Sequence, residues 1–432
     1  MTYALCLLYV SLIYIRPGEL FPQLESIPFV AITGAFALVA AATSAYFSRP
    51  RPYFNLPIDW CVLGFFLAAV ASLPSNGWLG GAIVTATKLF PVLTFYLITR
   101  IAVETRRQFK WLIVVIVCLT LFQATSGILQ YFTGAGFGNA AAVTQSIEAG
   151  NEDGFGAPPA AAVRRVRGTG IFGDPNDLAM ALVIVCPFLF TALLDGTTGK
   201  IRRALALAAL GTVVAALVLT QSRGGLLGLA ALGGAYAYRR FGKVPSLVVT
   251  AVLAGAVLVA GSSRLQDMNA SEESAQGRIQ AWAAGFEMLR SRPVLGVGVD
   301  QYQEHHELVA HNSFMHAAAE LGLVGMYCFV GLFYWLFVSN GARRDVEGAA
   351  TSALALDCWA SGIGMLVCVC FLSRQYSPVL YVPIALGAVR TAVERAPGDP
   401  VAFWRTSDWF RMLLLCAGTL IALFVAVRLF GE

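Results

Sequence analysis

The sequence has 432 residues, of which 57% are Ala, Val, Ile, Leu, Met, Phe, Trp, Tyr or Cys and only 13% are charged. A soluble domain is about 45–50% apolar, glycine included, and about 25% charged, so this composition excludes a soluble enzyme, a disordered chain and a disulfide scaffold. The net charge of +5 does not indicate a nucleic-acid partner, because the basic residues are scattered between apolar runs. A polytopic membrane protein is the class that fits.

Apolar runs of spanning length recur along the whole chain and predict an all-α, polytopic bundle of transmembrane helices. The first run is short, and the run over 377–390 is a weak candidate for a span. About 12 (12–13) spans are therefore expected, and the side of the membrane on which the C-terminus lies stays open. The first run lacks a charged n-region and a small-residue cleavage site, which argues against a cleavable signal peptide. Residues 1–432 are therefore treated as a single integral membrane domain. The candidate spans are 1–15, 26–47, 58–74, 79–98, 110–132, 177–195, 204–220, 224–238, 244–262, 312–338, 351–373, 377–390 and 411–430.

The basic residues set the expected orientation. With the N-terminus inside, the short connections that carry most of the lysines and arginines fall on one side, which is then cytoplasmic. The two longest connections, 133–176 and 263–311, both fall outside, where every basic residue is an arginine. The predicted cytoplasmic residues are Arg49, Arg51, Arg100, Arg106, Arg107, Lys110, Lys200, Arg202, Arg203, Arg239, Arg240, Lys243, Arg343 and Arg344.

All four histidines, His305, His306, His311 and His316, lie at the end of the second long connection and the start of the next span. Their clustering at a water–membrane boundary favours a functional site over isolated packing residues. The stretch from His306 to His311 is one residue too long for the H-E-x-x-H zinc motif. Residues five apart on a helix are related by a rotation of about 500°, so the two rings point in different directions. The nine cysteines lie within spans, where packing explains them. We therefore expect no metal site.

The residues around His311 predict the start of a helix. Asn312 or Ser313 can be the N-cap of the span that follows. The positive end of that helix would favour anions and help to keep the His311 imidazole neutral, as a base must be. Upstream, 278–290 is predicted to be an amphipathic helix at the outer interface, and Gly296-Val297-Gly298 is a turn without the surroundings of a nucleotide-binding fingerprint.

Two other polar elements lie at the outer ends of spans. Arg223 lies between Ser222 and Gly224. A charged side chain at such a position costs free energy unless it is paired or hydrated. Snorkelling of the side chain to the interface also explains its presence. Arg167 precedes the Asp174-Pro175-Asn176 element, in which Asp174 is a plausible N-cap and Pro175 the first helical residue.

The order of these elements resembles that of the O-antigen ligase and polysaccharide polymerase superfamily of bacterial inner membranes. The likeness covers roughly 164–326, and elsewhere only the membrane topology is shared. The residues that carry it are Arg167, Pro175, Asn176, Ser222-Arg223-Gly224, Arg278, Trp282, Pro293, Gly296-Val297-Gly298, His311-Asn312, Glu320-Leu321-Gly322 and Gly325.

The resemblance implies an inverting, metal-independent glycosyltransferase without a cofactor, acting at the periplasmic face. The two long connections would then be periplasmic loops, of which 263–311 carries catalytic residues. The donor would be a glycan on undecaprenyl diphosphate, and the acceptor of a ligase would be a sugar hydroxyl of the lipid A-core. The other expected partners are membrane lipids, with no nucleic acid and with the oligomeric state left open.

Three residues of the chain match the family's functional positions: His311 its catalytic histidine, and Arg223 and Arg278 its two essential arginines. Elementary chemistry agrees, since a sugar hydroxyl needs a proton acceptor and a departing diphosphate gathers negative charge that guanidinium groups stabilise. Substrate binding is expected of Arg167, Asn176, Asn312, Arg374 and Lys88. For Lys88, which lies inside a span, a structural pairing is equally compatible.

Two alternatives remain open at this point. A repeat-unit polymerase or a protein O-glycosylation ligase of the same superfamily would share the catalytic step and differ only in the acceptor. A lipid-linked oligosaccharide transporter would instead predict polar or broken helices at mid-membrane in two related halves, whereas this polar cluster lies at one face.

Overall fold

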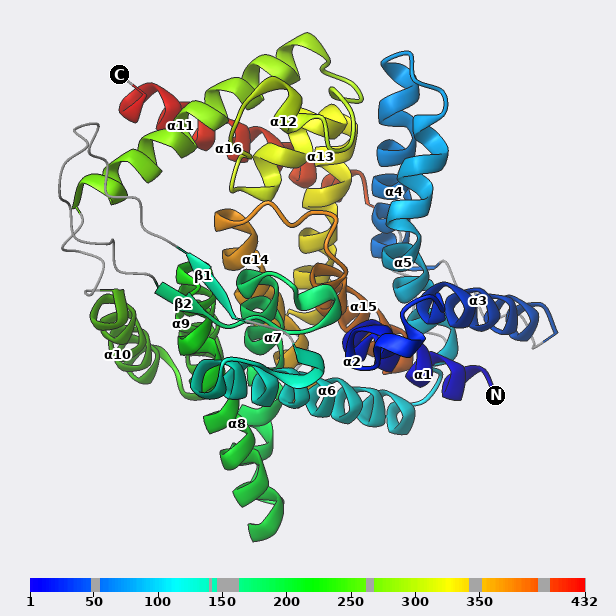
Figure 1. The fold of residues 1–432 in the computed structure, drawn as a ribbon, viewed down its shortest axis with the longest axis vertical. Coiled ribbons are helices and arrows are strands. Elements are labelled where there is room, and N and C mark those ends of the chain that lie inside the picture. The colour runs from blue at the N-terminus through cyan, green and yellow to red at the C-terminus, as the bar shows by residue number, and fades with distance from the viewer. Residues whose placement is uncertain are drawn as a thin grey trace.

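The computed structural model describes residues 1–47, 55–139, 142–145, 163–261, 268–341, 352–394 and 405–431. Figure 1 shows a bundle of helices with one small β-ribbon. The predicted cytoplasmic residues Arg49, Arg51, Arg343 and Arg344, and parts of both long connections, lie outside the described residues. The α-helices are α1 (Thr2–Ile15), α2 (Pro17–Leu20), α3 (Phe29–Phe47), α4 (Pro57–Ser75), α5 (Gly81–Ala102), α6 (Arg106–Thr133), α7 (Pro175–Leu194), α8 (Lys200–Thr220), α9 (Arg223–Phe241), α10 (Lys243–Gly261), α11 (Met268–Ser291), α12 (Tyr302–His305), α13 (Ser313–Asn340), α14 (Ala353–Phe371), α15 (Pro378–Val393) and α16 (Thr406–Phe430).

The long helices coincide with the predicted spans. Within the described ranges, nine helices are long and apolar enough to cross a membrane, and α1, α15 and the Lys243–Ala256 part of α10 are shorter apolar helices. A further predicted span is α9, which carries an arginine at its start and two near its end. The prediction of a polytopic helical bundle is confirmed.

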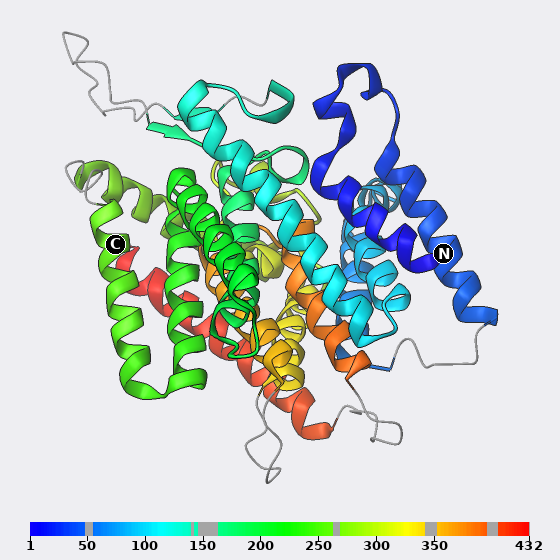
Figure 2. The ribbon, with the colours of Figure 1, turned by 90° about the horizontal axis from the view of Figure 1, so that it is seen from below.

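The bundle has a buried centre and a lipid-exposed rim. Helices α7, α13, α14 and α15 are mostly buried, whereas α3, α8, α10 and α16 expose many leucine, valine and phenylalanine side chains. Since lipid tails are apolar, such exposed side chains are expected on the outside of a membrane bundle. In Figure 2, the β-ribbon and the end of α6 lie at the upper edge, and the turn between α9 and α10 lies at the lower edge.

Within the residues that the structure describes, the first long connection contains the one β-ribbon of the chain. Strands β1 (Val143–Gln145) and β2 (Val163–Arg165) pair antiparallel, with Val143 opposite Arg165. Two 3-10 helices, η2 (Phe137–Asn139) and η3 (Gly170–Phe172), accompany the ribbon. The ribbon orients its arginines: Arg164 donates to the carbonyl oxygen of Tyr131 at 2.9 Å.

The second long connection contains α11 and α12. The helix predicted over 278–290 is longer than expected, because α11 begins at Met268. Its apolar face packs against α13 and α16, where the rings of Phe286 and Phe424 meet edge to face at 5.7 Å. Figure 1 shows α11 and α16 crossing at the end of the bundle that carries α12.

The turn predicted at Gly296 docks against a break in α13. Gly322 interrupts that helix with a left-handed φ of 64°, and Gly296 has a φ of 67°. A Cβ atom at Gly296 would lie 2.2 Å from the carbonyl carbon of Glu320, so only glycine fits. The backbone groups at the break are satisfied by the turn: Val297 N–H donates to Ala319 O and Gly298 N–H to Glu320 O, both at 3.0 Å. Protein backbone therefore fills the break.

Candidate active site

His311 lies between α12 and α13 in a strained backbone conformation. Its φ is 47°, a left-handed value that costs a residue other than glycine about 1–3 kcal/mol and that clusters at functional sites. The side chain is half-buried, and its ring makes no hydrogen bond with any described residue. His305 and His306, by contrast, hydrogen-bond within their own loop, and His316 pairs with Glu320. Among the described residues, His311 is thus the histidine with both ring nitrogens unpaired, whereas His316 leaves only Nδ1 without a partner.

The start of α13 fixes the position of His311. Asn312, one of the two predicted candidates, is the N-cap, and its Oδ1 accepts from the N–H groups of Phe314 and Met315 at 3.0 Å. Its Nδ2 donates to the Cys370 carbonyl at 3.1 Å, and Ser313 Oγ donates to the Leu372 carbonyl at 2.6 Å. Because these bonds occupy the Asn312 amide, it anchors the helix start to the end of α14, and its predicted contact with substrate stays a prediction.

Helix α11 is tied to the same segment. Trp282 donates from Nε1 to the carbonyl oxygen of Ala310 at 2.7 Å, next to His311. Arg278 lies one helical turn before Trp282 on α11. Arg278 is half-buried and forms no hydrogen bond or ion pair with the residues that the structure describes.

Electrostatic effects link the three residues predicted to be catalytic. Burial and the charges of Arg278 and Arg374 lower the pKa of His311, while Asp174 opposes this shift. Burial and the charge of Arg223 lower the pKa of Arg278. The charge of Arg278 therefore acts on His311, and the charge of Arg223 acts on Arg278.

Arg223 is the first residue of α9 and is exposed. A cation at a helix N-terminus opposes the helix dipole, which costs about 0.3–1 kcal/mol. Its guanidinium has no hydrogen bond or ion pair among the described residues. An unfavourably placed, unpaired arginine is suited to an anionic ligand.

Arg165 is a residue that the sequence did not single out. Its Nε donates to the Thr220 carbonyl at 3.0 Å, and its NH2 donates to Asn176 Oδ1 at 3.1 Å. Ser222, the N-cap of α9, donates to the same Asn176 oxygen at 2.8 Å. The Pro-Asn element and the Ser-Arg-Gly element are thus one structure, in which Asn176 positions the turn before Arg223.

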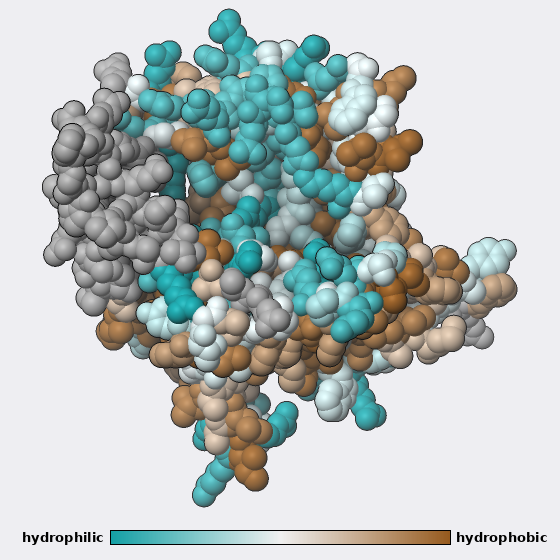
Figure 3. All heavy atoms as spheres, in the orientation of Figure 1, coloured by the Kyte–Doolittle hydropathy of each residue, from teal (hydrophilic) through white to brown (hydrophobic). Residues whose placement is uncertain are grey.

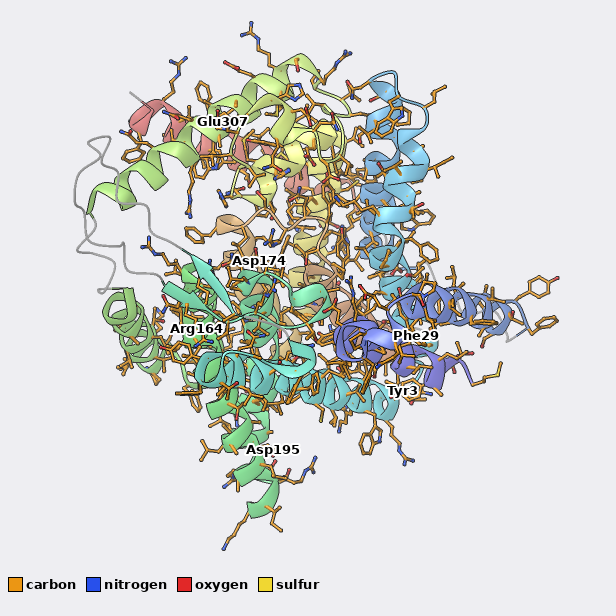
Figure 4. All side chains as sticks on the ribbon, viewed as in Figure 1. Tyr3, Phe29, Arg164, Asp174, Asp195 and Glu307 are labelled. Carbon is orange, nitrogen blue, oxygen red and sulfur yellow. The ribbon has the colours of Figure 1, made fainter. Side chains whose placement is uncertain are left out.

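Arg374 is held by two carboxylates. It forms ion pairs with Asp174 at 2.7 Å and with Asp177 at 2.9 Å. Asp174 also caps α7, as predicted, by accepting from the Asn176 N–H at 2.7 Å. In Figure 4, Asp174 lies between the part that contains α11–α13 and the part that contains α6–α9. Arg167, nearby in sequence, donates from NH1 to the Gly173 carbonyl at 3.4 Å.

A cavity of about 460 Å³ adjoins these residues and is lined by Arg16, Lys88, Asp300, His316 and Arg374, among others. Lys88 forms an ion pair with Asp300. Two residues predicted to bind substrate, Lys88 and Arg374, thus share one cavity, whereas His311, Arg223 and Arg278 are not among its lining residues. Figure 3 shows a hollow bordered by hydrophilic residues on the face of the molecule that it draws.

A second pair that the sequence did not reveal lies at the edge of this cavity. Glu320 is fully buried, accepts from Tyr376 Oη at 2.8 Å and from the Tyr302 N–H at 3.1 Å, and has its Oε1 3.0 Å from His316 Nε2. His316 is near His311, because its charge contributes to lowering the pKa of His311. Spacing alone allowed a His316–Glu320 contact, since residues four apart share a helix face.

A larger, mostly apolar cavity of about 750 Å³ lies between α1, α3 and α5. It shares Arg16, Val30 and Pro91 with the polar cavity, so the two are neighbours. As for metal ions, no group of three or more His, Cys, Asp or Glu side chains that could hold one occurs in the part of the chain that the structure describes.

The comparison with known families adds independent information. Residues 204–330 match the family model described as O-antigen ligase. This segment contains Arg223, Arg278, His311 and the break in α13, whereas Arg167 and Asn176 precede it. No curated protein matches the chain. This matched segment supports the resemblance of the chain to the O-antigen ligase and polysaccharide polymerase superfamily.

Proposed function

We propose that the protein is an inverting, metal-independent O-antigen ligase, which moves a glycan from undecaprenyl diphosphate to a sugar hydroxyl of lipid A-core. The reaction would take place at the periplasmic face of a bacterial inner membrane. One observation carries the proposal: the His311 ring has no hydrogen-bond partner among the described residues. The charge of Arg278, which acts on His311 and is itself affected by Arg223, supports it.

His311 is the proposed general base. A base must be neutral to accept a proton, and burial together with the charges of Arg278 and Arg374 lowers the His311 pKa, which favours the neutral ring. As the acceptor oxygen attacks the anomeric carbon, the hydroxyl proton passes to the imidazole. General-base catalysis by a positioned side chain typically accelerates a reaction about 10²–10⁴-fold.

Arg223 and Arg278 are proposed to hold the leaving group. When the bond between the anomeric carbon and the phosphate oxygen breaks, the electron pair leaves with undecaprenyl diphosphate, and the configuration at the anomeric carbon inverts. Unpaired guanidinium groups, placed before the reaction, stabilise the charge that develops on the phosphate oxygens. A diphosphate leaves without a proton, so the mechanism needs no general acid.

The two adjoining cavities suit a lipid-linked diphosphate. The polar cavity contains Lys88, Arg374 and Arg16, and the neighbouring apolar cavity could hold isoprenoid units next to it. We propose that Lys88 and Arg374 guide the diphosphate towards Arg278, with Arg167 at the rim. Asn176 and Asn312 are then positioning residues, since their amides hold the turns that carry Arg223 and His311.

The test uses the purified full-length protein in proteoliposomes with a glycan on undecaprenyl diphosphate, a chelator, and competing acceptors. We expect chelator-resistant transfer to lipid A-core, with an inverted anomeric configuration in the product by NMR. Preferential transfer to a second repeat unit or to a protein hydroxyl would assign the polymerase or the protein ligase of the same superfamily. Retained anomeric configuration, or loss of transfer with chelator, would contradict the mechanism.

A further inference from the structure

A third cavity, of about 410 Å³, lies between the starts of α6 and α8. We call it the basic pocket, and its lining residues are Arg106, Arg107, Lys110, Trp111, Val114 and Arg202. Its volume is within the range of about 300–1,000 Å³ that is typical of small-molecule sites. Four of the six lining residues are cationic, and none is acidic.

The basic pocket lies at the end of the bundle opposite the candidate active site. Both helices end next to strand β2: Arg164 donates to the Tyr131 carbonyl near the end of α6, and Arg165 donates to the Thr220 carbonyl at the end of α8. At about 1.5 Å per residue, the 28 residues of α6 place Arg106 about 40 Å from that end. The basic pocket and the turn before Arg223 therefore lie at opposite ends of these helices.

One side of α6 carries cationic residues near the start of the helix and apolar residues next to them. Arg107, Lys110, Trp111 and Val114 follow each other at i, i+3, i+4 and i+7, so they share one side of the helix. The cations come first, and Trp111, which is 55% exposed, and Val114 lie towards the bilayer interior. A tryptophan at such a level is typical of the boundary between headgroups and acyl chains.

Most of the positive charge in the basic pocket is not neutralised by protein. Arg106 pairs with Glu394 at 3.3 Å, but Arg107, Lys110 and Arg202 make no hydrogen bond or ion pair with the described residues. Cations crowded on one helix face repel each other. An anion in the pocket would relieve that repulsion.

Some other basic residues predicted on the same side have partners within the protein. Arg100 pairs with buried Asp59 at 3.3 Å, and Arg239 stacks on the Trp359 ring with 3.7 Å to its centroid. A general excess of lysine and arginine on the cytoplasmic side accounts for charge there, but not for three unpaired cations that line one cavity.

We propose that the basic pocket binds the phosphate headgroup of an anionic phospholipid, with an acyl chain lying along Trp111 and Val114. Basic pockets between transmembrane helices on the cytoplasmic side bind such headgroups in other membrane proteins. This site is distinct from the donor and acceptor sites and does not depend on the reaction proposed above.

The experiment is native mass spectrometry of the full-length protein in detergent, with phosphatidylglycerol or phosphatidylcholine added. The pocket variant combines Arg107→Gln, Lys110→Gln and Arg202→Gln. The matched control variant combines Arg203→Gln, Arg240→Gln and Lys243→Gln, which removes the same residue types from the same side but outside the pocket. We expect selective retention of phosphatidylglycerol by the wild type and the control, and at least about tenfold weaker retention by the pocket variant.

Three further outcomes decide the proposal. Equal retention of phosphatidylglycerol by the pocket variant and the control would overturn it. Displacement of the lipid by excess glycerol phosphate would also overturn it, because the pocket would then take a free phosphate. Arg107→Lys combined with Arg202→Lys keeps the charge and should retain the lipid. If the triple pocket variant does not fold, Arg202→Gln alone is compared with Arg203→Gln in the same way.

Discussion

The indole nitrogen of Trp282 donates a hydrogen bond to the carbonyl oxygen of Ala310 at 2.7 Å. This bond joins α11, which carries Arg278, to the backbone just before His311. The segment with the proposed base and the helix with one of the proposed diphosphate ligands are thus joined by a contact between residues 28 apart in the sequence.

Trp282→Phe should lower kcat by about three- to tenfold, because it keeps an aromatic ring and removes the donor of a hydrogen bond worth about 0.5–1.5 kcal/mol. Initial rates with lipid-linked donor would measure the effect. Trp78→Phe, at a half-exposed position, is the control and should leave the rate unchanged. Equal rates for the two variants would mean that the Trp282 bond does not position the base.

Changes around His311 should move the acid limb of the pH–rate profile in opposite directions. The groups that act on the His311 pKa are Arg278, Arg374, His316 and Asp174. Arg278→Gln removes a charge that lowers this pKa, so the base becomes protonated at higher pH and the limb should shift upwards. Asp174→Asn removes a charge that raises it, so the limb should shift downwards, and asparagine can still cap α7.

The pH dependence of kcat/KM measures both shifts, because it reports the ionisation of the free enzyme. The Arg278 variant will also be slower overall, but the position of the limb does not depend on the maximal rate. Shifts in the same direction, or no shift, would show that the limb belongs to a group other than His311.

Arg165→Gln should reduce the rate about tenfold. The substitution removes the bonds to the Thr220 carbonyl and to Asn176, which hold the turn before Arg223. Arg165 acts by positioning, so Arg165→Lys should restore part of the rate, mainly through kcat. Arg164→Gln, a neighbouring arginine on the same strand, is the control; a larger loss from that variant would refute the role of Arg165.

Gly296→Ala should destabilise the protein by about 1–3 kcal/mol. The new Cβ would collide with the backbone of Glu320 at a residue with a left-handed φ of 67°. Thermal unfolding in detergent, followed by intrinsic fluorescence, would show the loss. Gly211→Ala meets nothing within 4 Å in α8 and should be neutral or stabilising. Equal unfolding temperatures would exclude a tight docking of the turn on α13.

The sequence was sufficient to predict the features that depend on local pattern. Hydropathy located the helices, because each span must be apolar along its own length. Asn312 and Asp174 were predicted as caps, since a capping side chain bonds to backbone within three residues. The resemblance to the family groups His311, Arg223 and Arg278 in one hypothesis, which stays a prediction.

Features that depend on distant partners were not predictable. The turn at Gly296 was evident, but not that it fills a break at Gly322, because hydropathy does not encode which segments pack together. Arg165 was overlooked since its partners lie on two other helices. The Tyr376–Glu320 bond spans 56 positions, so no spacing rule points to it.

The most direct test of the central claim compares wild type with His311→Gln in proteoliposomes that contain lipid-linked donor, acceptor and chelator. Glutamine keeps hydrogen-bonding capacity but cannot accept a proton at neutral pH. We predict a loss in kcat of about 10²–10⁴-fold with donor binding preserved. Transfer by His311→Gln at the wild-type rate would contradict the role of His311 as the base.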